Sequence, residues 1–111
     1  MRGDDQVRLQ HMLDAAHEAV AFTQGRVRED LDADRMLTLS LVKEIEIIGE
    51  AANQVSETTR KQLPAIPWAD IAGMRNRLVH VYFGINLEIL WRTAQHDLPP
   101  LIGVLERVLK G

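Results

Sequence analysis

The chain of 111 residues contains no cysteine, only 5% aromatic residues and four prolines, and each shortage excludes a class of protein. Without cysteine there is no disulfide framework, thiolate metal site or thiol nucleophile, and nothing indicates an oxidising compartment. The aromatic residues are too few to predict a platform that stacks bases of single-stranded nucleic acid. No apolar run approaches the roughly 20 residues of a membrane span, and the first residues lack the apolar region of a signal peptide. We therefore expect a soluble, cytoplasmic protein without membrane contact.

Length and net charge narrow the possibilities further. A chain of 111 residues allows one domain, over residues 1–111, and folding at this size buries only about 65% of the surface that the unfolded chain exposes. An oligomer is a natural way to enlarge such a core. The net charge of −3 argues against broad, nonspecific binding to nucleic acid, which needs many cations to neutralise phosphates. Any contact with RNA must therefore be local.

Hydrophobic periodicity predicts an all-α fold. The expected architecture is an antiparallel bundle of four long helices plus a short one, at about residues 4–24, 34–57, 67–80, from 86 onward, and after the two prolines at 99 and 100. Boundary residues agree with these limits: the first helix should end before Gly25, Asp34 or a neighbouring Asp should cap the second, Pro67 should open the third and Asn86 should cap the fourth.

The second expected helix carries more apolar residues than one buried face needs. One stripe is widened on both sides, and its members are Leu37, Leu41, Ile45, Ile48, Ala52 and Val55 with Met36, Leu39, Val42, Ile47 and Ala51 beside them. Such a helix is expected to pack on two sides, one within the protomer and one against a partner, which predicts a homodimer. Gly49, in the middle of the helix, costs about 1 kcal/mol relative to alanine and suggests a close helix crossing, although a merely tolerated small residue is equally consistent.

The sequence lacks the signature motifs of the commonest enzyme classes. It has no Walker loop, no Rossmann glycine fingerprint, no H-E-x-x-H and no G-x-S-x-G. His11 and His17 lie six residues apart, a poor spacing for one metal ion on a helix, and His96 is most simply a surface or capping residue. Glu46 and Glu50 could act as acid and base, or could simply form a solvated helix face. We predict neither a metal nor a cofactor.

One segment, residues 74–82, gathers side chains suited to cleaving a phosphodiester. An arginine, Arg75, offers a planar set of donors that matches phosphate and stabilises charge on a phosphorane. A histidine, His80, can take a proton from a ribose 2′-hydroxyl or return one to the leaving 5′-oxygen, and no metal is required. Asn76 and His80 lie within about 40° of each other on an ideal helix.

Arg75 and His80 themselves are about 140° apart on an ideal helix. For both to reach one substrate, the helix must end or distort near His80, or a second protomer must complete the pair. Gly84, just beyond, makes such an ending plausible, and a twofold dimer would bring two copies into one cleft. Arg77 is a weaker candidate for substrate binding, since it could instead pair with Asp70 or Glu88 at the surface.

The segment Arg75-Asn76-Arg77-Leu78-Val79-His80-Val81-Tyr82 resembles the signature of the HepT-like toxins of the HEPN superfamily, R-x4-H followed by x-Y. Asn76 supplies the polar residue commonly found after the arginine. Supporting similarity runs through residues 30–36, 46–53 and 66–68, whereas the stretch before Asp30 matches less distinctively. The resemblance implies a HEPN-type helical bundle.

The same resemblance implies a homodimeric, metal-independent endoribonuclease. It would be the toxin of a type VII-like toxin–antitoxin pair, with a minimal nucleotidyltransferase as antitoxin partner and RNA as substrate. Arg75 and His80 would carry cleavage, with Asn76 in support, and Tyr82 would be the hydroxyl that the partner modifies with AMP. The added negative phosphate and bulk beside the cleft would oppose RNA binding.

Two other interpretations stay open at this point. The chain could be a helical dimer that binds a nucleotidyltransferase or a nucleotide and cleaves nothing. Tyr82 could be only a packing or catalytic-site residue that is never modified.

Overall fold

The all-α prediction is confirmed by a computed structural model, which describes residues 1–80 and 84–110. The periodicity predicted the long helices among the first 80 residues, and short helical pieces connect them. The helix predicted from residue 86 is only six residues long, and the terminal helix begins at Leu98, before the two prolines and not after them, since a first helical turn tolerates proline. In chain order the elements are α1 (Gly3–Phe22), α2 (Asp30–Ala33), α3 (Arg35–Gln54), α4 (Glu57–Gln62), α5 (Trp68–Leu78), β1 (Val79–His80), β2 (Gly84–Ile85), α6 (Leu87–Arg92), the π-helical turn η1 (Thr93–Asp97) and α7 (Leu98–Lys110).

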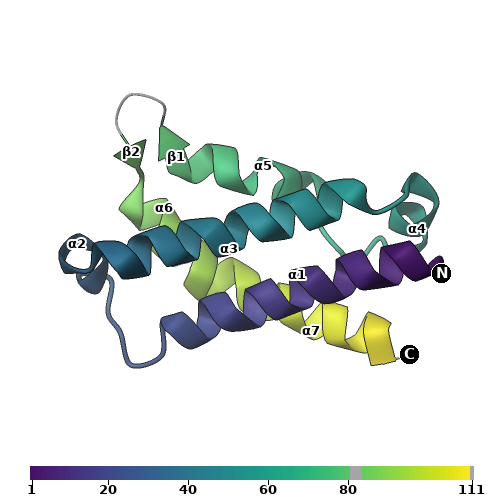
Figure 1. The fold of residues 1–111 in the computed structure, drawn as a ribbon, viewed down its shortest axis with the longest axis horizontal. Helices are drawn as coiled ribbons and strands as arrows, with labels where there is room; N and C mark the ends of the chain where they lie inside the picture. Colours follow the sequence, from purple (N-terminus) through teal and green to yellow (C-terminus); the bar gives the residue numbers. More distant parts are fainter. Residues whose placement is uncertain (81–83, 111) are drawn as a thin grey trace.

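The helix α3 lies at the centre of the arrangement. Figure 1 shows it between α1 and α5, running opposite to both, while α6 and α7 cross behind this layer. The helix α1 packs on α3 and α7, and α5 packs on α3. No helix among the described residues is long and apolar enough to cross a membrane.

The core lies between these helices and comes mainly from α1, α3, α5 and α7. Its largest fully buried side chains are Leu9, Met12, Leu41, Ile45, Ile48, Ile66, Ile71, Leu78, Leu90, Leu98, Leu105 and Val55. Most of the apolar surplus predicted for α3, including Val42 and Ala51, is buried within the protomer. The inner positions are buried, whereas Met36 and Leu39 on the outer face are 80% and 46% exposed.

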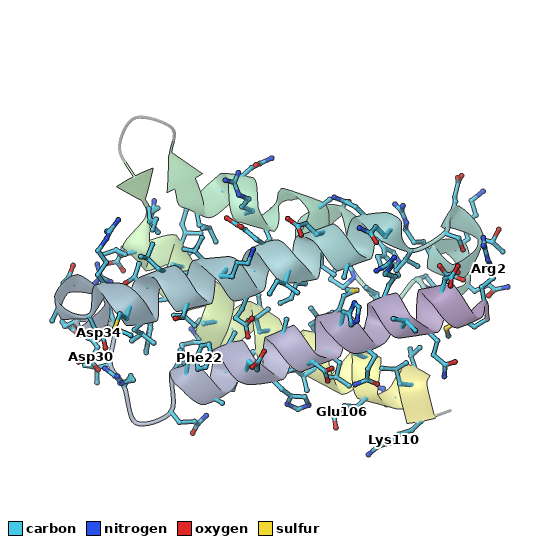
Figure 2. All side chains as sticks on the ribbon, in the orientation of Figure 1. Arg2, Phe22, Asp30, Asp34, Glu106 and Lys110 are labelled. Carbon is cyan, nitrogen blue, oxygen red and sulfur yellow. The ribbon has the colours of Figure 1, made fainter. Side chains whose placement is uncertain are left out.

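The predicted helix boundaries follow local chemistry. Gly25 has a φ of 72°, a left-handed conformation that glycine adopts without strain, and α1 ends just before it. The Asp34 carboxylate accepts a hydrogen bond from the Leu37 amide at 3.1 Å and caps α3, and Figure 2 shows Asp34 at this junction. The Asn86 side chain caps α6 in the same way, accepting from the Ile89 amide at 3.1 Å.

Three further expectations need correction. The second long helix ends at Gln54, not about residue 57, because Ser56 caps a separate helix, α4, whose Thr59 amide donates to the Ser56 hydroxyl. Gly49 does lie against α5, but a Cβ there would be 3.9 Å from the Ile71 carbonyl oxygen, an ordinary contact, so the crossing does not require glycine.

The third correction concerns the segment after α5. This helix ends at Leu78, two residues earlier than expected, and a small antiparallel hairpin follows in which Val79 pairs with Ile85 and His80 with Gly84. The Asn86 amide donates to the Leu78 carbonyl at 2.6 Å, which closes the base of the hairpin at the end of the helix. Gly84 has a φ of 80°, which allows the chain to turn back.

Candidate active site

A groove between α3 and α5 holds two of the predicted site residues, Arg75 and Asn76. Its volume is about 380 Å³, and its lining is Glu46, Gly49, Glu50, Asn53, Ile71, Ala72, Arg75 and Asn76. The groove joins two segments far apart in the sequence, residues 46–53 on α3 and residues 71–76 on α5. Residues 46–53 form one stretch of the sequence resemblance, and Arg75 and Asn76 begin another, so the fold brings parts of these two stretches together.

The guanidinium of Arg75 is hydrogen-bonded through one nitrogen, and about half of the side chain is exposed to solvent. Its Nε donates to the Glu46 carboxylate at 3.3 Å, and the side chains of Arg75 and Glu46 are 53% and 27% exposed. Only Nε is used in this bond, and the two terminal nitrogens of a guanidinium carry four further N–H donors. The arrangement orients Arg75 in the groove while its terminal donors remain able to meet a planar oxyanion such as a phosphate.

The helix that bears Arg75 ends before it reaches His80. Since α5 ends at Leu78, His80 lies in the strand β1 and is freed from the helical angle that would separate it from Arg75. The ladder to Gly84 fixes the backbone of His80 at the end of the helix that bears Arg75 and Asn76. Figure 1 shows this hairpin extending α5 at the end of the molecule where α2 lies.

Arg77 and Tyr82 are two further predicted site residues. Tyr82 lies outside the described residues. Arg77 lies on a different side of α5, where it donates to the Asp70 carbonyl at 3.0 Å and lines a separate cavity. Of its two expected partners, Asp70 is thus contacted through its backbone, whereas Glu88 pairs with Arg28 at 2.7 Å.

The carboxylates of Glu46 and Glu50 both line the groove. Sequence reasoning offered them as an acid and base or as a solvated face, and missed the contact of Glu46 with Arg75. Glu46 and Arg75 are 29 positions apart, and no local sequence pattern predicts a contact between them. The one available signal was that Glu46 opens the second segment of the resemblance.

The remaining histidines lie away from this groove. His17 on α1 faces Glu106 on α7, labelled in Figure 2, with Nε2 3.9 Å from the carboxylate. His11 is exposed on α1, and His96 lies in η1 beside Asp97. Within the described parts of the chain, no group of three or more His, Asp or Glu side chains could hold a metal ion.

Two further carboxylates lie within the helical packing, and their environments differ. Asp5 accepts hydrogen bonds from the Ser56 hydroxyl, the Thr59 hydroxyl and the Ser56 amide, which lower its pKa to about 2. Burial between α1 and α3, together with the neighbouring Glu18, raises the pKa of Glu44 to about 7. Neither residue touches the groove, so both belong to the scaffold.

The all-helical fold and its arginine-bearing groove define a helical protein with a candidate phosphate-binding site. Residues 12–108 match the model of the family described as "Ribonuclease HepT-like". The chain therefore belongs to the HepT-like ribonuclease family.

Individual relatives agree with the family match. A protein of Thermococcus cleftensis named "Probable ribonuclease HepT" is 33% identical over 102 residues, which cover 92% of this chain and 93% of the relative. A protein of Caldanaerobacter subterraneus named "Putative RNase" is 35% identical over 102 residues, which cover 92% of this chain and 91% of the relative. A "Putative RNase" of Methanocaldococcus jannaschii is 31% identical over 93 residues, or 84% and 85% of the two chains. No solved structure matches the chain.

Proposed function

We propose that this protein is a metal-independent endoribonuclease in which Arg75 and His80 cleave RNA by attack of a ribose 2′-hydroxyl on the adjacent phosphorus. The observation that carries the proposal is the α3–α5 groove, where Glu46 orients an otherwise exposed Arg75 and the helix ends two residues before His80. Family membership supports a ribonuclease, and the groove supports its location.

Arg75 is the residue expected to bind the scissile phosphate. In the transition state negative charge grows on the non-bridging oxygens, and the terminal N–H groups of Arg75 would donate to them. One such donor is worth about 3–4 kcal/mol when it is held in place beforehand, and the bond to Glu46 provides that orientation. Asn76 lines the same groove and would add a neutral amide donor to the phosphate or ribose.

His80 is expected to move the protons. As a base it would take the proton of the 2′-hydroxyl, and as an acid it would return a proton to the 5′-oxygen that leaves, so that the products are a 2′,3′-cyclic phosphate and a 5′-hydroxyl. This general acid–base contribution is about 10²–10⁴-fold. One imidazole serves one role at a time, so two roles in the same cleavage favour two histidines.

A second protomer would supply the second histidine. The exposed apolar side chains of Met36 and Leu39 lie on the outer face of α3. Leu39 and Glu46 are seven residues apart, so they point within about 20° of each other on an ideal helix. Leu39 and the groove therefore lie on the same side of α3, with the polar residues Ser40 and Lys43 between them. A copy of the chain that covered Met36 and Leu39 would bring its own groove close to the first.

We further propose that the protein acts as a toxin whose partner is a minimal nucleotidyltransferase. In the regulatory step, the Tyr82 hydroxyl attacks the α-phosphorus of ATP, a Tyr–O–P bond forms, pyrophosphate leaves and the hydroxyl proton passes to solvent. Tyr82 lies two residues after His80, and modification would place bulk and negative charge next to an RNA phosphate. The basis of this proposal is the resemblance of residues 75–82 to the family signature.

The cleavage proposal is tested with purified Arg75→Ala and His80→Ala proteins on a mixed-sequence RNA in the presence of a chelator. Cleavage should persist in the parent and fall by at least about 10²-fold in each variant, with the oligomeric state unchanged. Exposed His11 gives a matched control, since His11→Ala should cleave normally. A parent that binds a nucleotidyltransferase but cleaves no RNA would favour the alternative, a helical binding dimer without catalysis.

Sharing of the site between protomers is tested by mixing the parent protein with an excess of the His80→Ala variant. If each cleavage uses His80 of both protomers, a mixed dimer lacks one of the two histidines, so activity should fall below that of the same amount of parent alone. If each protomer cleaves by itself, the activity of the parent should be unchanged by the mixing. Modification of Tyr82 is tested separately, by mass spectrometry after incubation with the proposed partner and ATP, with Tyr82→Phe as the control.

A further inference from the structure

A second cavity lies on another side of α5 from Arg75. Its volume is about 240 Å³, and it is enclosed by Pro67, by α5, by the π-helical turn η1 and by the first turn of α7. Its side chains form an apolar floor and a polar rim. The floor consists of Ile71, Met74 and Leu101, each no more than 4% exposed. A ligand that enters this cavity must therefore place apolar atoms at the bottom.

The rim is rich in hydrogen-bond acceptors. Asp70 and Asp97 both line the cavity, and among the described residues neither carboxylate forms an ion pair. They come from different elements, α5 and η1. A group that touched both would have to carry several donors, and carboxylates favour a positively charged one.

Two consecutive prolines add to this acceptor character. Pro99 and Pro100 have no amide N–H, so they cannot complete the α-helical hydrogen bonds to the carbonyls four residues back, Gln95 and His96. The helix passes this point through the π-helical turn Thr93–Asp97, where the Leu98 amide donates to the Thr93 carbonyl. His96 and Pro100 both line the cavity, so backbone acceptors deprived of their helical donor lie beside its rim.

The protein's own Arg77 indicates which donor group suits this rim. Its guanidinium already donates to the Asp70 carbonyl at 3.0 Å, and it leans over Gly73, where a Cβ would approach Arg77 Nη1 to 3.1 Å. The edge of the cavity at Asp70 thus already accepts a hydrogen bond from a guanidinium. Asp97, from η1, lies on a different wall of the cavity and is available to a second cation.

We propose that this cavity binds an arginine side chain presented by a partner protein. The methylene stem would lie on Ile71, Met74 and Leu101, and the guanidinium would bind between Asp70 and Asp97, with the opened carbonyls accepting its remaining donors. Arginine fits this set because its planar head offers five donors while its stem is apolar. The inference is independent of RNA cleavage, since the cavity lies on another side of α5 from the groove of Arg75.

The test uses a short acetylated, amidated Leu-Arg-Leu peptide added to the full-length ¹⁵N-labelled protein and followed by NMR. Amide shifts should change at Asp70, Arg77 and residues 96–101, and the same peptide with citrulline, which is neutral but similar in shape, should bind about tenfold more weakly. Asp70→Asn and Asp97→Asn should each weaken arginine binding about threefold to fivefold, as expected for exposed ion pairs. Asp14→Asn, on the exposed side of α1, is the matched control.

Two opposite substitutions sharpen this experiment. Arg77→Ala removes the competing guanidinium and should strengthen peptide binding about twofold to threefold, a gain that general destabilisation would not produce. Pro100→Ala restores an amide donor to the His96 carbonyl and should weaken binding slightly. Equal binding of the citrulline peptide, shifts confined to the α3–α5 groove, or a site that responds to inorganic phosphate rather than to the peptide would each overturn the proposal.

Discussion

Glu44 and Glu46 lie two residues apart on α3 and have opposite surroundings. Glu44 points toward α1, is 5% exposed, and has one carboxylate oxygen, Oε2, without a hydrogen-bond partner in the described part of the chain. Glu46 lines the groove toward α5 and bonds to Arg75. The same side chain on the same helix thus has an unpartnered buried oxygen on one face and a bond to an arginine on the other. Residue type alone therefore does not assign a role, because the face of the helix decides which neighbours a side chain meets.

The largest effect should come from the arginine that Glu46 holds. Arg75→Lys keeps the charge but loses the planar fork and the Nε bond to Glu46, so we expect cleavage to fall about tenfold to a hundredfold with little change in melting temperature. Initial rates on a defined RNA, together with thermal unfolding, measure both. Arg92→Lys, at an exposed position on α6, should cleave at the parent rate. Full activity of Arg75→Lys would show that only a point charge is needed.

The next effect concerns Glu46 as a positioning residue. Glu46→Gln weakens the hold on Arg75 and should lower kcat about threefold to tenfold, whereas KM should not rise because a negative charge has left the groove. Glu50 lines the same groove, but among the described residues the carboxylate bonded to Arg75 is that of Glu46, so Glu50→Gln should lower KM with kcat unchanged. If the two variants behave alike, the Glu46 contact does not orient Arg75.

Changing Glu44, on the face of α3 toward α1, should alter the free energy of unfolding. The pKa of Glu44 is about 7 in the folded protein against an ordinary value of 4.5, so the folded state keeps a proton that the unfolded state has released. Stability is therefore greatest below about pH 4.5 for this group and falls as the pH rises through 7. Glu44→Gln removes the penalty and should add on the order of 1 kcal/mol at pH 8, or a rise in melting temperature of about 4–8 °C.

The gain from Glu44→Gln should shrink as the pH is lowered toward 5. Glu18, which faces Glu44, is exposed and has an easier route to solvent, so Glu18→Gln should give a smaller gain. Cleavage at saturating RNA should be the same in both variants. A Glu44→Gln protein that is less stable than the parent at pH 8 would mean that the ionised carboxylate has a stabilising partner.

The last effect concerns Asp5, where the pKa is lowered and the pH dependence of stability has the opposite sign. Its hydrogen bonds from Ser56 and Thr59 stabilise the folded state above about pH 4, and this contribution is lost as the pH falls through about 2. Thr59→Val removes one donor, so the midpoint of acid unfolding, followed by circular dichroism, should move to higher pH. An unchanged midpoint would indicate that the Ser56 donors are sufficient.

The sequence predicted the helices well because their signals are local. Periodic apolar residues placed α1, α3 and α7, and the caps at Asp34 and Asn86 are each visible within four residues. The hairpin after Leu78 was missed because its two strands are only two residues long, while apolar residues continue the helical pattern through Val79. Short strands of this kind carry too little pattern to compete with a strong helix.

The candidate site was predictable only in part. Arg75, Asn76 and His80 lie within six residues and form a motif, so they could be proposed from the sequence. The contact between Glu46 and Arg75, the position of Arg77 on another side of α5 and the cavity at η1 all depend on how helices pack. Packing joins residues that are distant in the sequence, and one sequence contains no direct record of those contacts.

The most direct test of the ribonuclease account is the pH dependence of RNA cleavage by the parent and His80→Ala proteins in a chelator. A histidine that transfers protons should give the parent a rate that changes with pH near neutrality, and His80→Ala should lose at least about 10²-fold of the rate together with that dependence. Cleavage by His80→Ala at the parent rate, with the same pH profile, would contradict the account.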